Sequence, residues 1–317
     1  MQESFFYHSF PRRALDGPSE IETGCKILSL IRDVGLLLTP EILKWQYPHA
    51  DGTPPRSHEI LQQRVCFTEL PPAELAGHAR EFGHFALEFG IDTLKGLGAM
   101  PVFYIPQPGN QTDELAWLGS TLVMQVIDAM VLTMRLAGVQ ECLDESPPIV
   151  DGRMKHQFGF TKPMWFSLDI AETRRVLEAF AYGLTPPKEL EDALAGLLNL
   201  FYPADDIPRN KFLAYYRQRE WRIARNFAVR NVEAMWLPST ELIDHLLKID
   251  SEFYAKEFPP SSGKRRADGT FVCPGIGGKR IIEMVRRVIV PNEAVERAKV
   301  ILIGLNNPPS VVAFDAR

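Results

Sequence analysis

Three short segments of the chain each place a polar side chain inside an apolar run. They are His8 in FFYHSF, Thr68 in VCFTEL and Glu220 in EWRIA. Imidazole, hydroxyl and carboxylate groups supply much of the acid–base and charge-stabilising chemistry of enzymes. We therefore treat the three residues as one candidate site, on the condition that the fold brings them together.

Each of these residues also has an ordinary structural explanation. His8 fits a hydrogen-bonded histidine of the core. Thr68 fits a cap of the turn that begins at Pro71. Glu220 fits an ion-pair partner of Arg222 on a solvated strand face. Wide separation of the three side chains in space would favour these explanations.

A second group of polar residues combines His78 and His84 with Glu81 and Glu88, and suggests a metal-dependent nuclease. A metal site needs three or four converging ligands. The two histidines are six residues apart, a spacing that does not place both on one face of a helix. Gly83 is expected to end the element between them. We predict no metal site and keep the nuclease as an alternative function.

The glycine run GIGG at positions 275–278 is followed by Lys279 and Arg280. Backbone amides beside two cations are able to hold a phosphate. The run lacks the spacing of a P-loop or of a dinucleotide fingerprint, so a plain turn is favoured.

The elements that must position these residues follow from the local patterns. Strands cluster early and late in the chain and helices are inserted between them, which favours an α+β fold over a doubly wound sheet. We expect one elaborated domain over residues 1–317, with a mainly helical insertion over residues 107–205. The expected strands are 4–10, 65–70, 84–89, 101–105 and 220–224; the expected helices are 21–37, 73–80, 111–138, 171–199 and 241–253; residues 45–62 are expected to form a long loop.

Composition and charge exclude several classes of protein. The chain has 317 residues, of which 45% are hydrophobic and 24% charged, as in soluble globular proteins. The net charge of −5 does not favour strong nucleic-acid binding by phosphate neutralisation. Four widely separated cysteines predict neither a zinc knuckle nor a redox motif.

Localisation follows from two further features. The N-terminus lacks the pattern of a signal peptide. Residues 115–137 are the most apolar long stretch, but Gln125, Asp128 and Arg135 interrupt it, which favours a buried helix over a membrane span. We expect a cytoplasmic protein that does not associate with membranes.

The order and content of five segments resemble the AbiGi-type family of abortive-infection proteins. The segments are FFYHSFPR, KILSLIRDVGLLLTPE, RVCFTEL, FGHFALEFGIDTLKGLGAMPVFYI and RNKFLAYYRQREWRIA. This resemblance covers most of residues 4–105 and 209–226. The order His, aromatic-Thr, Glu is also similar, more weakly, to the His–aromatic–Glu signature of ADP-ribosyltransferases.

The second resemblance implies an ADP-ribosyltransferase-like fold, in which a mixed or antiparallel split β-sheet holds NAD in its cleft. It implies that His8 hydrogen-bonds a ribose and that Tyr7 or Phe67 stacks on the nicotinamide. Glu220 would stabilise an oxocarbenium-like transition state, with Thr68 as the third catalytic residue.

Two arginines complete the site that this resemblance implies. Arg222 follows Glu220 by two residues, which places it on the same strand face, where it would keep the carboxylate ionised and contact NAD. Arg12 would reach the pyrophosphate. Gln218 stands two residues before Glu220, where toxins of this type often carry a second glutamate.

The AbiGi-type resemblance implies a bacterial phage-defence protein that acts by abortive infection, within a toxin–antitoxin system. We expect an NAD-dependent ADP-ribosyltransferase-like toxin. The partner would be an operon-encoded toxin or antitoxin, or a phage protein. The alternatives are a non-enzymatic antitoxin or phage sensor that keeps the fold without turnover, and the nuclease described above.

Overall fold

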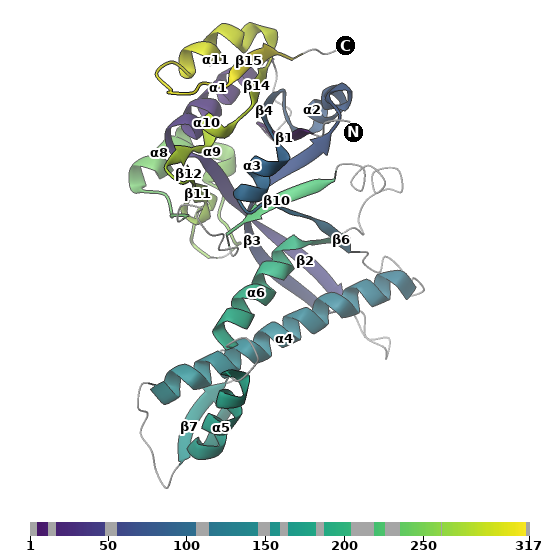
Figure 1. Cartoon of the computed structure of the whole chain (residues 1–317), viewed down its shortest axis with the longest axis vertical. Helices are drawn as coiled ribbons and strands as arrows, with labels where there is room; N and C mark the ends of the chain where they lie inside the picture. Colours follow the sequence, from purple (N-terminus) through teal and green to yellow (C-terminus); the bar gives the residue numbers. More distant parts are fainter. Residues whose placement is uncertain are drawn as a thin grey trace.

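The structure is a computed structural model, drawn as a ribbon in Figure 1. It describes residues 5–11, 17–47, 56–105, 114–144, 153–158, 164–181, 187–203, 219–225, 235–260 and 262–314.

Nine strands of the described chain form one sheet. Its ladders are antiparallel, except that β14 and β15 are parallel. The sheet is therefore mixed and mostly antiparallel, which confirms the predicted α+β class. The strands are β1 (Phe5–Phe10), β2 (Leu36–Tyr47), β3 (Arg56–Leu70), β4 (Phe85–Phe89), β5 (Met100–Pro101), β10 (Glu220–Ala224), β11 (Phe271–Cys273), β14 (Arg287–Val290) and β15 (Ser310–Ala313).

The sheet is split along one edge of the long strand β3. Thr68 pairs with one residue of β1 and one of β10, and Arg64 pairs with one residue of β2 and one of β10. A strand has two edges, and β10 occupies the same edge at both positions. Strands β1 and β2 therefore share the opposite edge, and neither of them pairs with residues 65–67 of β3.

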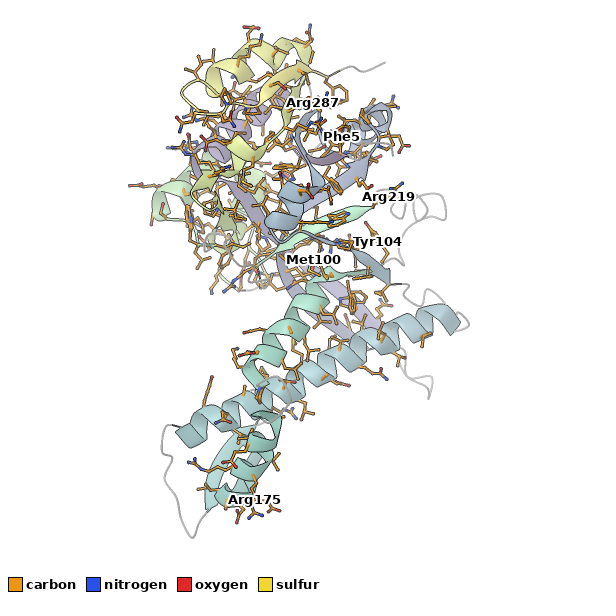
Figure 2. All side chains as sticks on the ribbon, in the orientation of Figure 1. Phe5, Met100, Tyr104, Arg175, Arg219 and Arg287 are labelled. Carbon is orange, nitrogen blue, oxygen red and sulfur yellow. The ribbon has the colours of Figure 1, made fainter. Side chains whose placement is uncertain are left out.

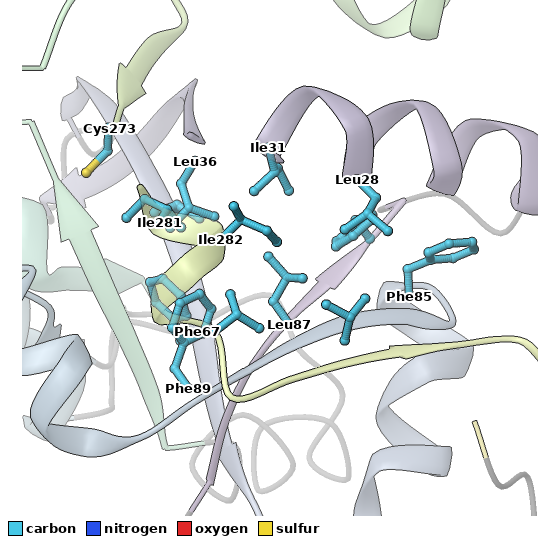
Figure 3. Packing of buried hydrophobic residues seen from close by; sticks show 14 of the residues in the cluster. Leu28, Ile31, Leu36, Phe67, Phe85, Leu87, Phe89, Cys273, Ile281 and Ile282 are labelled. Carbon is cyan, nitrogen blue, oxygen red and sulfur yellow. The ribbon is translucent and has the colours of Figure 1, made fainter. Parts of the chain in front are cut away.

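The largest apolar core lies between this sheet and four helices, and Figure 3 shows its packing. Leu28 and Ile31 of α1 are fully buried against Phe67 and Leu87 of the sheet. Alternating apolar residues of the strands meet a helical apolar stripe, as expected for an α+β core. The helices are α1 (Gly17–Val34), α3 (Ile91–Gly96), α10 (Ile281–Met284) and α11 (Val295–Ile301).

Gly35 makes the tight connection from α1 to β2. Its φ is +117°, a backbone conformation that side chains rarely allow, and a Cβ here would clash with the carbonyl oxygen of Cys273. The glycine thus both ends the helix and lets β11 approach β2.

Shorter helices cover two further surfaces. Helix α2 (Leu75–Phe82) covers the sheet face that carries Tyr7 and Leu70. Helices α8 (Thr240–Ile249) and α9 (Ser251–Tyr254) pack against α1. Ser239 caps α8 by accepting a hydrogen bond from the Leu242 amide at 3.3 Å. The short 3₁₀ segments are η1 (Pro72–Glu74), η2 (Arg266–Gly269) and η3 (Asn292–Ala294).

A unit built around the long helix α4 (Glu114–Asp144) extends away from the sheet, as Figure 1 shows. Val123 and Ile127 of α4 pack against Leu43 and Trp45 of β2. The other elements of the range 107–205 are β7 (Arg153–Phe158), β8 (Met164–Asp169), α5 (Ile170–Ala181), α6 (Pro187–Leu200) and β9 (Phe201–Pro203), with β9 paired to β6 (Phe103–Ile105).

Helix α4 is less buried than the sequence suggests. Only 28% of the window Leu118–Glu141 is buried, and Leu118, Leu122 and Leu132 are exposed. By length and composition this window is the one candidate membrane span in the described part of the chain. The expectation of a buried helix therefore holds only for the face that packs on β2.

The prediction of a loop over residues 45–62 is wrong at both ends. Strand β2 continues to Tyr47 and β3 begins at Arg56, and the two strands pair over nine positions. Residues 48–55 lie outside the described residues. The glycine run forms the turn between β12 (Gly275–Ile276) and β13 (Lys279–Arg280), as expected.

Candidate active-site cavity

A cavity of about 390 Å³ lies where β1 and β2 separate along β3. Its wall includes His8 of β1, Thr68 of β3 and Glu220 of β10, so the fold brings the three candidate residues together. Tyr7 and Arg222 also line it. Further wall residues come from α1, α2, β2, β9 and the segment that joins α8 to α9.

The cavity reaches both faces of the sheet. Thr68 pairs with Glu220, so their side chains share one face. His8 is two residues from Phe6 and from Phe10, so its side chain shares their face, which is the face that carries the main core. The gap beside residues 65–67 connects the two sides.

His8 bridges this gap. Its Nδ1 donates a hydrogen bond to the carbonyl oxygen of Cys66 at 3.0 Å. The backbone carbonyl requires a proton on Nδ1, so Nε2 of a neutral His8 is a hydrogen-bond acceptor. The ring also packs against Phe67, with the ring centroids 5.8 Å apart.

His78 orients the Thr68 hydroxyl. The Nε2 of His78 lies 3.0 Å from Thr68 Oγ1, and its Nδ1 lies 3.4 Å from Ser9 Oγ. Burial, together with the nearby His8, lowers the pKa of His78 to about 4. His78 is therefore neutral at neutral pH and acts as a hydrogen-bonding group rather than as a cation.

The Glu220 carboxylate is held by two side chains. Arg222 Nε donates to Oε1 at 2.8 Å, and Tyr104 Oη donates to Oε2 at 2.8 Å. Burial by itself would raise the pKa of Glu220, but the charges of Arg222 and Arg64 outweigh it and lower the pKa to about 2. Figure 2 shows Tyr104 below the strand that carries Arg219 at its start.

A second arginine lies on the same wall. The Arg64 side chain is 4% exposed and that of Arg222 is 1% exposed. Their guanidinium carbons lie 5.1 Å and 4.8 Å from the centre of the Tyr202 ring, so the two cations share one aromatic ring. Arg64 also pairs with Glu41 and donates to Gln62 Oε1 at 2.8 Å.

One of the predicted NAD-binding residues, Phe67, does not line the cavity. Phe67 is fully buried, and its ring packs edge-to-face on Phe89 in the core, so it does not line the cavity. The period of two along β3 turns Phe67 away from the face that carries Thr68. Arg12 lies outside the described residues.

The His/Glu group diverges in space. His84 pairs with Glu20, and Glu88 pairs with Arg287, whereas His78 and Glu81 line the cavity. No three His, Cys, Asp or Glu side chains within the described ranges converge as metal ligands. This group therefore gives no structural support to a metal-dependent nuclease.

The cavity-wall residues that sequence reasoning missed include Arg64, Tyr202 and Ser9. The spacing of Arg64 and Thr68 indicates that Arg64 belongs to the same site, because residues four apart on a strand share a face. Tyr202 comes from β9, whose approach to β10 no local pattern predicts.

We compared the chain with protein-family models, with curated proteins and with solved structures, and none of them matches it.

Proposed function

We propose that the cavity binds NAD and that the protein cleaves the bond between nicotinamide and ribose, as an ADP-ribosyltransferase does. The observation that carries the proposal is the shared cavity, which His8, Thr68 and Glu220 line from three separate strands. Its volume of about 390 Å³ falls within the range of small-molecule sites, roughly 300–1,000 Å³. The wall offers the hydroxyl, imidazole and carboxylate groups that suit a ribose.

In the proposed reaction the bond from ribose C1′ to the nicotinamide nitrogen breaks, and nicotinamide leaves with the bonding electron pair. Positive charge remains on the ribose until water or an acceptor nucleophile adds at C1′ and loses a proton. A fixed carboxylate interacts more strongly with this charge than with the neutral sugar in its ground state. Glu220 suits this role because its low pKa keeps it ionised and Arg222 and Tyr104 fix its orientation.

The remaining polar groups suit the binding of the sugar and the base. His8 and Thr68 would hydrogen-bond ribose hydroxyls, and neutral His78 would hold the Thr68 hydroxyl in place. Tyr7 is the aromatic candidate for the nicotinamide, since Phe67 does not line the cavity.

The biological setting is part of the same proposal and comes from the resemblance to abortive-infection proteins. A protein that consumes NAD, or modifies a target with ADP-ribose, would stop growth of an infected cell. An operon-encoded antitoxin or a phage protein would then control the activity.

The decisive experiment compares Glu220→Gln with Glu69→Gln. Glutamine has the shape of glutamate and keeps hydrogen-bonding capacity beside Arg222 and Tyr104, whereas alanine would leave the buried Arg222 without its partner. Glu69 is the matched control because it lies next to Thr68, pairs with Arg219 and does not line the cavity. NAD affinity is measured by calorimetry and nicotinamide release by chromatography.

We expect the wild type and Glu69→Gln to release nicotinamide at similar rates. Glu220→Gln should still bind NAD but release nicotinamide at least about 100-fold more slowly, the scale of losing one charge-stabilising group. A folded wild-type protein that binds no NAD would refute the proposal and favour the non-enzymatic antitoxin or sensor. Equal release by Glu220→Gln would refute the role of Glu220.

A further inference from the structure

Arg64 and Arg222 each keep a buried N–H group that has no hydrogen-bond partner among the described residues. The unpartnered atoms are Nε of Arg64 and Nη1 of Arg222, both on side chains that are at least nine-tenths buried. Both residues line the cavity. A buried donor that stays unsatisfied costs free energy, so two of them on one cavity wall indicate an acceptor that binds there.

The charges on this wall favour an anion as that acceptor. Two guanidinium groups face two carboxylates, Glu220 and Glu41. The Glu41 side chain is 35% exposed, so water screens its charge, whereas both arginines are shielded from water. On the buried part of the wall the two guanidinium groups therefore face one carboxylate, Glu220, because the other acidic residues that line the cavity, Glu41, Glu81 and Asp250, are half-buried or exposed.

We propose that Arg64 and Arg222 bind a phosphate or pyrophosphate group of the ligand that occupies the cavity. Guanidinium groups suit phosphate oxygens because their N–H donors are fixed in a plane and always charged. Tyr202 keeps the two groups together by presenting its ring to both. As a statement about NAD, the inference rests on the proposed function. It places the pyrophosphate at Arg64 and Arg222, beside Tyr202.

The test uses the variant Arg64→Lys. Lysine keeps the positive charge beside Glu41 but removes the Nε–H donor and the planar fork. Arg219→Lys is the matched control, since Arg219 lies at the start of β10, is 66% exposed and does not line the cavity. Calorimetry measures the binding of ADP-ribose, which carries a pyrophosphate, and of nicotinamide riboside, which carries none.

We expect Arg64→Lys to weaken ADP-ribose binding by about tenfold or more, the scale of one charge-assisted hydrogen bond, and to leave nicotinamide riboside binding unchanged. Arg219→Lys should change neither affinity. Equal weakening of both ligands, or weakening of neither, would overturn the inference.

A second measurement needs no variant. It therefore still tests the anion site if Arg64→Lys fails to fold. In the wild type, inorganic pyrophosphate should compete with ADP-ribose but bind together with nicotinamide riboside. Absence of competition overturns the anion site even if NAD binds and is cleaved. Pyrophosphate binding without NAD cleavage supports the anion site and refutes the proposed function, so the two failures are distinguishable.

Discussion

At the scale of single residues, Glu220 shows how a buried carboxylate stays charged. Burial favours its neutral form, yet the charges of two guanidinium groups, Arg222 and Arg64, reverse that preference and lower its pKa. The hydrogen bonds from Arg222 and Tyr104 restrict its rotation. Orientation and ionisation are therefore fixed before any ligand arrives, which is the preorganisation that transition-state stabilisation needs.

His78 gives a prediction about stability and pH. Its pKa is about 4 in the folded protein and 6.5 in its ordinary state, so between these values the unfolded chain binds more protons. The free energy of unfolding should fall as the pH falls from 6.5 to 4, by up to about 3 kcal/mol for this residue. Urea denaturation across this range measures it.

The variant His78→Gln should be less sensitive to pH over the same interval, because glutamine does not titrate. His245, on the exposed side of α8, provides the control variant His245→Gln. Identical slopes for the wild type and His78→Gln would show that His78 is protonated in the folded protein.

The sequence identified part of the site at this scale. His8, Thr68 and Glu220 are predicted because each lies in a strand-like apolar run, and Arg222 because it follows Glu220 by two residues. His78 was noticed as a metal ligand candidate, and its contact with Thr68 depends on how α2 lies across the sheet. Such a contact between separate elements leaves no local pattern in the sequence.

At the scale of elements, strand β3 shows what a local pattern misses. Its apolar end, residues 65–70, was predicted, but its polar beginning resembled a loop. Residues from Arg56 onward are held by pairing with β2, and long-range pairing overrides a weak local preference for strand. Helix α1 and its end at Gly35 were predicted because helical spacing and a C-terminal glycine are local signals.

A substitution at Gly35 tests the connection between α1 and β2. Gly35→Ala should lower the free energy of unfolding by about 3 kcal/mol, because alanine is strained at this φ and clashes with β11. Thermal or urea denaturation measures the loss.

Gly77→Ala is the matched control. Gly77 is exposed within helix α2, and a Cβ there meets no atom within 4 Å. This substitution should stabilise the protein by about 0.5–1 kcal/mol, because alanine favours a helix. A Gly35→Ala variant as stable as the wild type would contradict the account of this connection.

At the scale of the whole molecule, the cavity and the outer end of the extended unit are separate. Figure 2 shows Arg175 of α5 at the end of the molecule away from Phe5 and Arg287. No described residue of β7, β8 or α5 lines the cavity, whereas Tyr202, which follows α6, does. The described residues of the outer elements therefore do not form the cavity wall, whereas β9 contributes to it.

Replacing residues 145–186 by a flexible Gly-Ser linker should leave ADP-ribose affinity within a few-fold of the wild type, provided that α4 and α6 still pack. Circular dichroism checks folding and calorimetry measures the affinity. Loss of binding by a folded variant would show that the outer elements shape the cavity.

The split edge of β3 also sets the time at which the cavity can be completed during synthesis. Strands β1 to β4 leave the ribosome early, whereas Arg219 pairs with Glu69 across 150 residues and the α8–α9 wall follows later still. A nascent or truncated chain that stops before residue 219 contains His8 and Thr68 but neither Glu220 nor Arg222. For a protein proposed to consume NAD, this order of assembly keeps incomplete chains harmless to the cell that makes them.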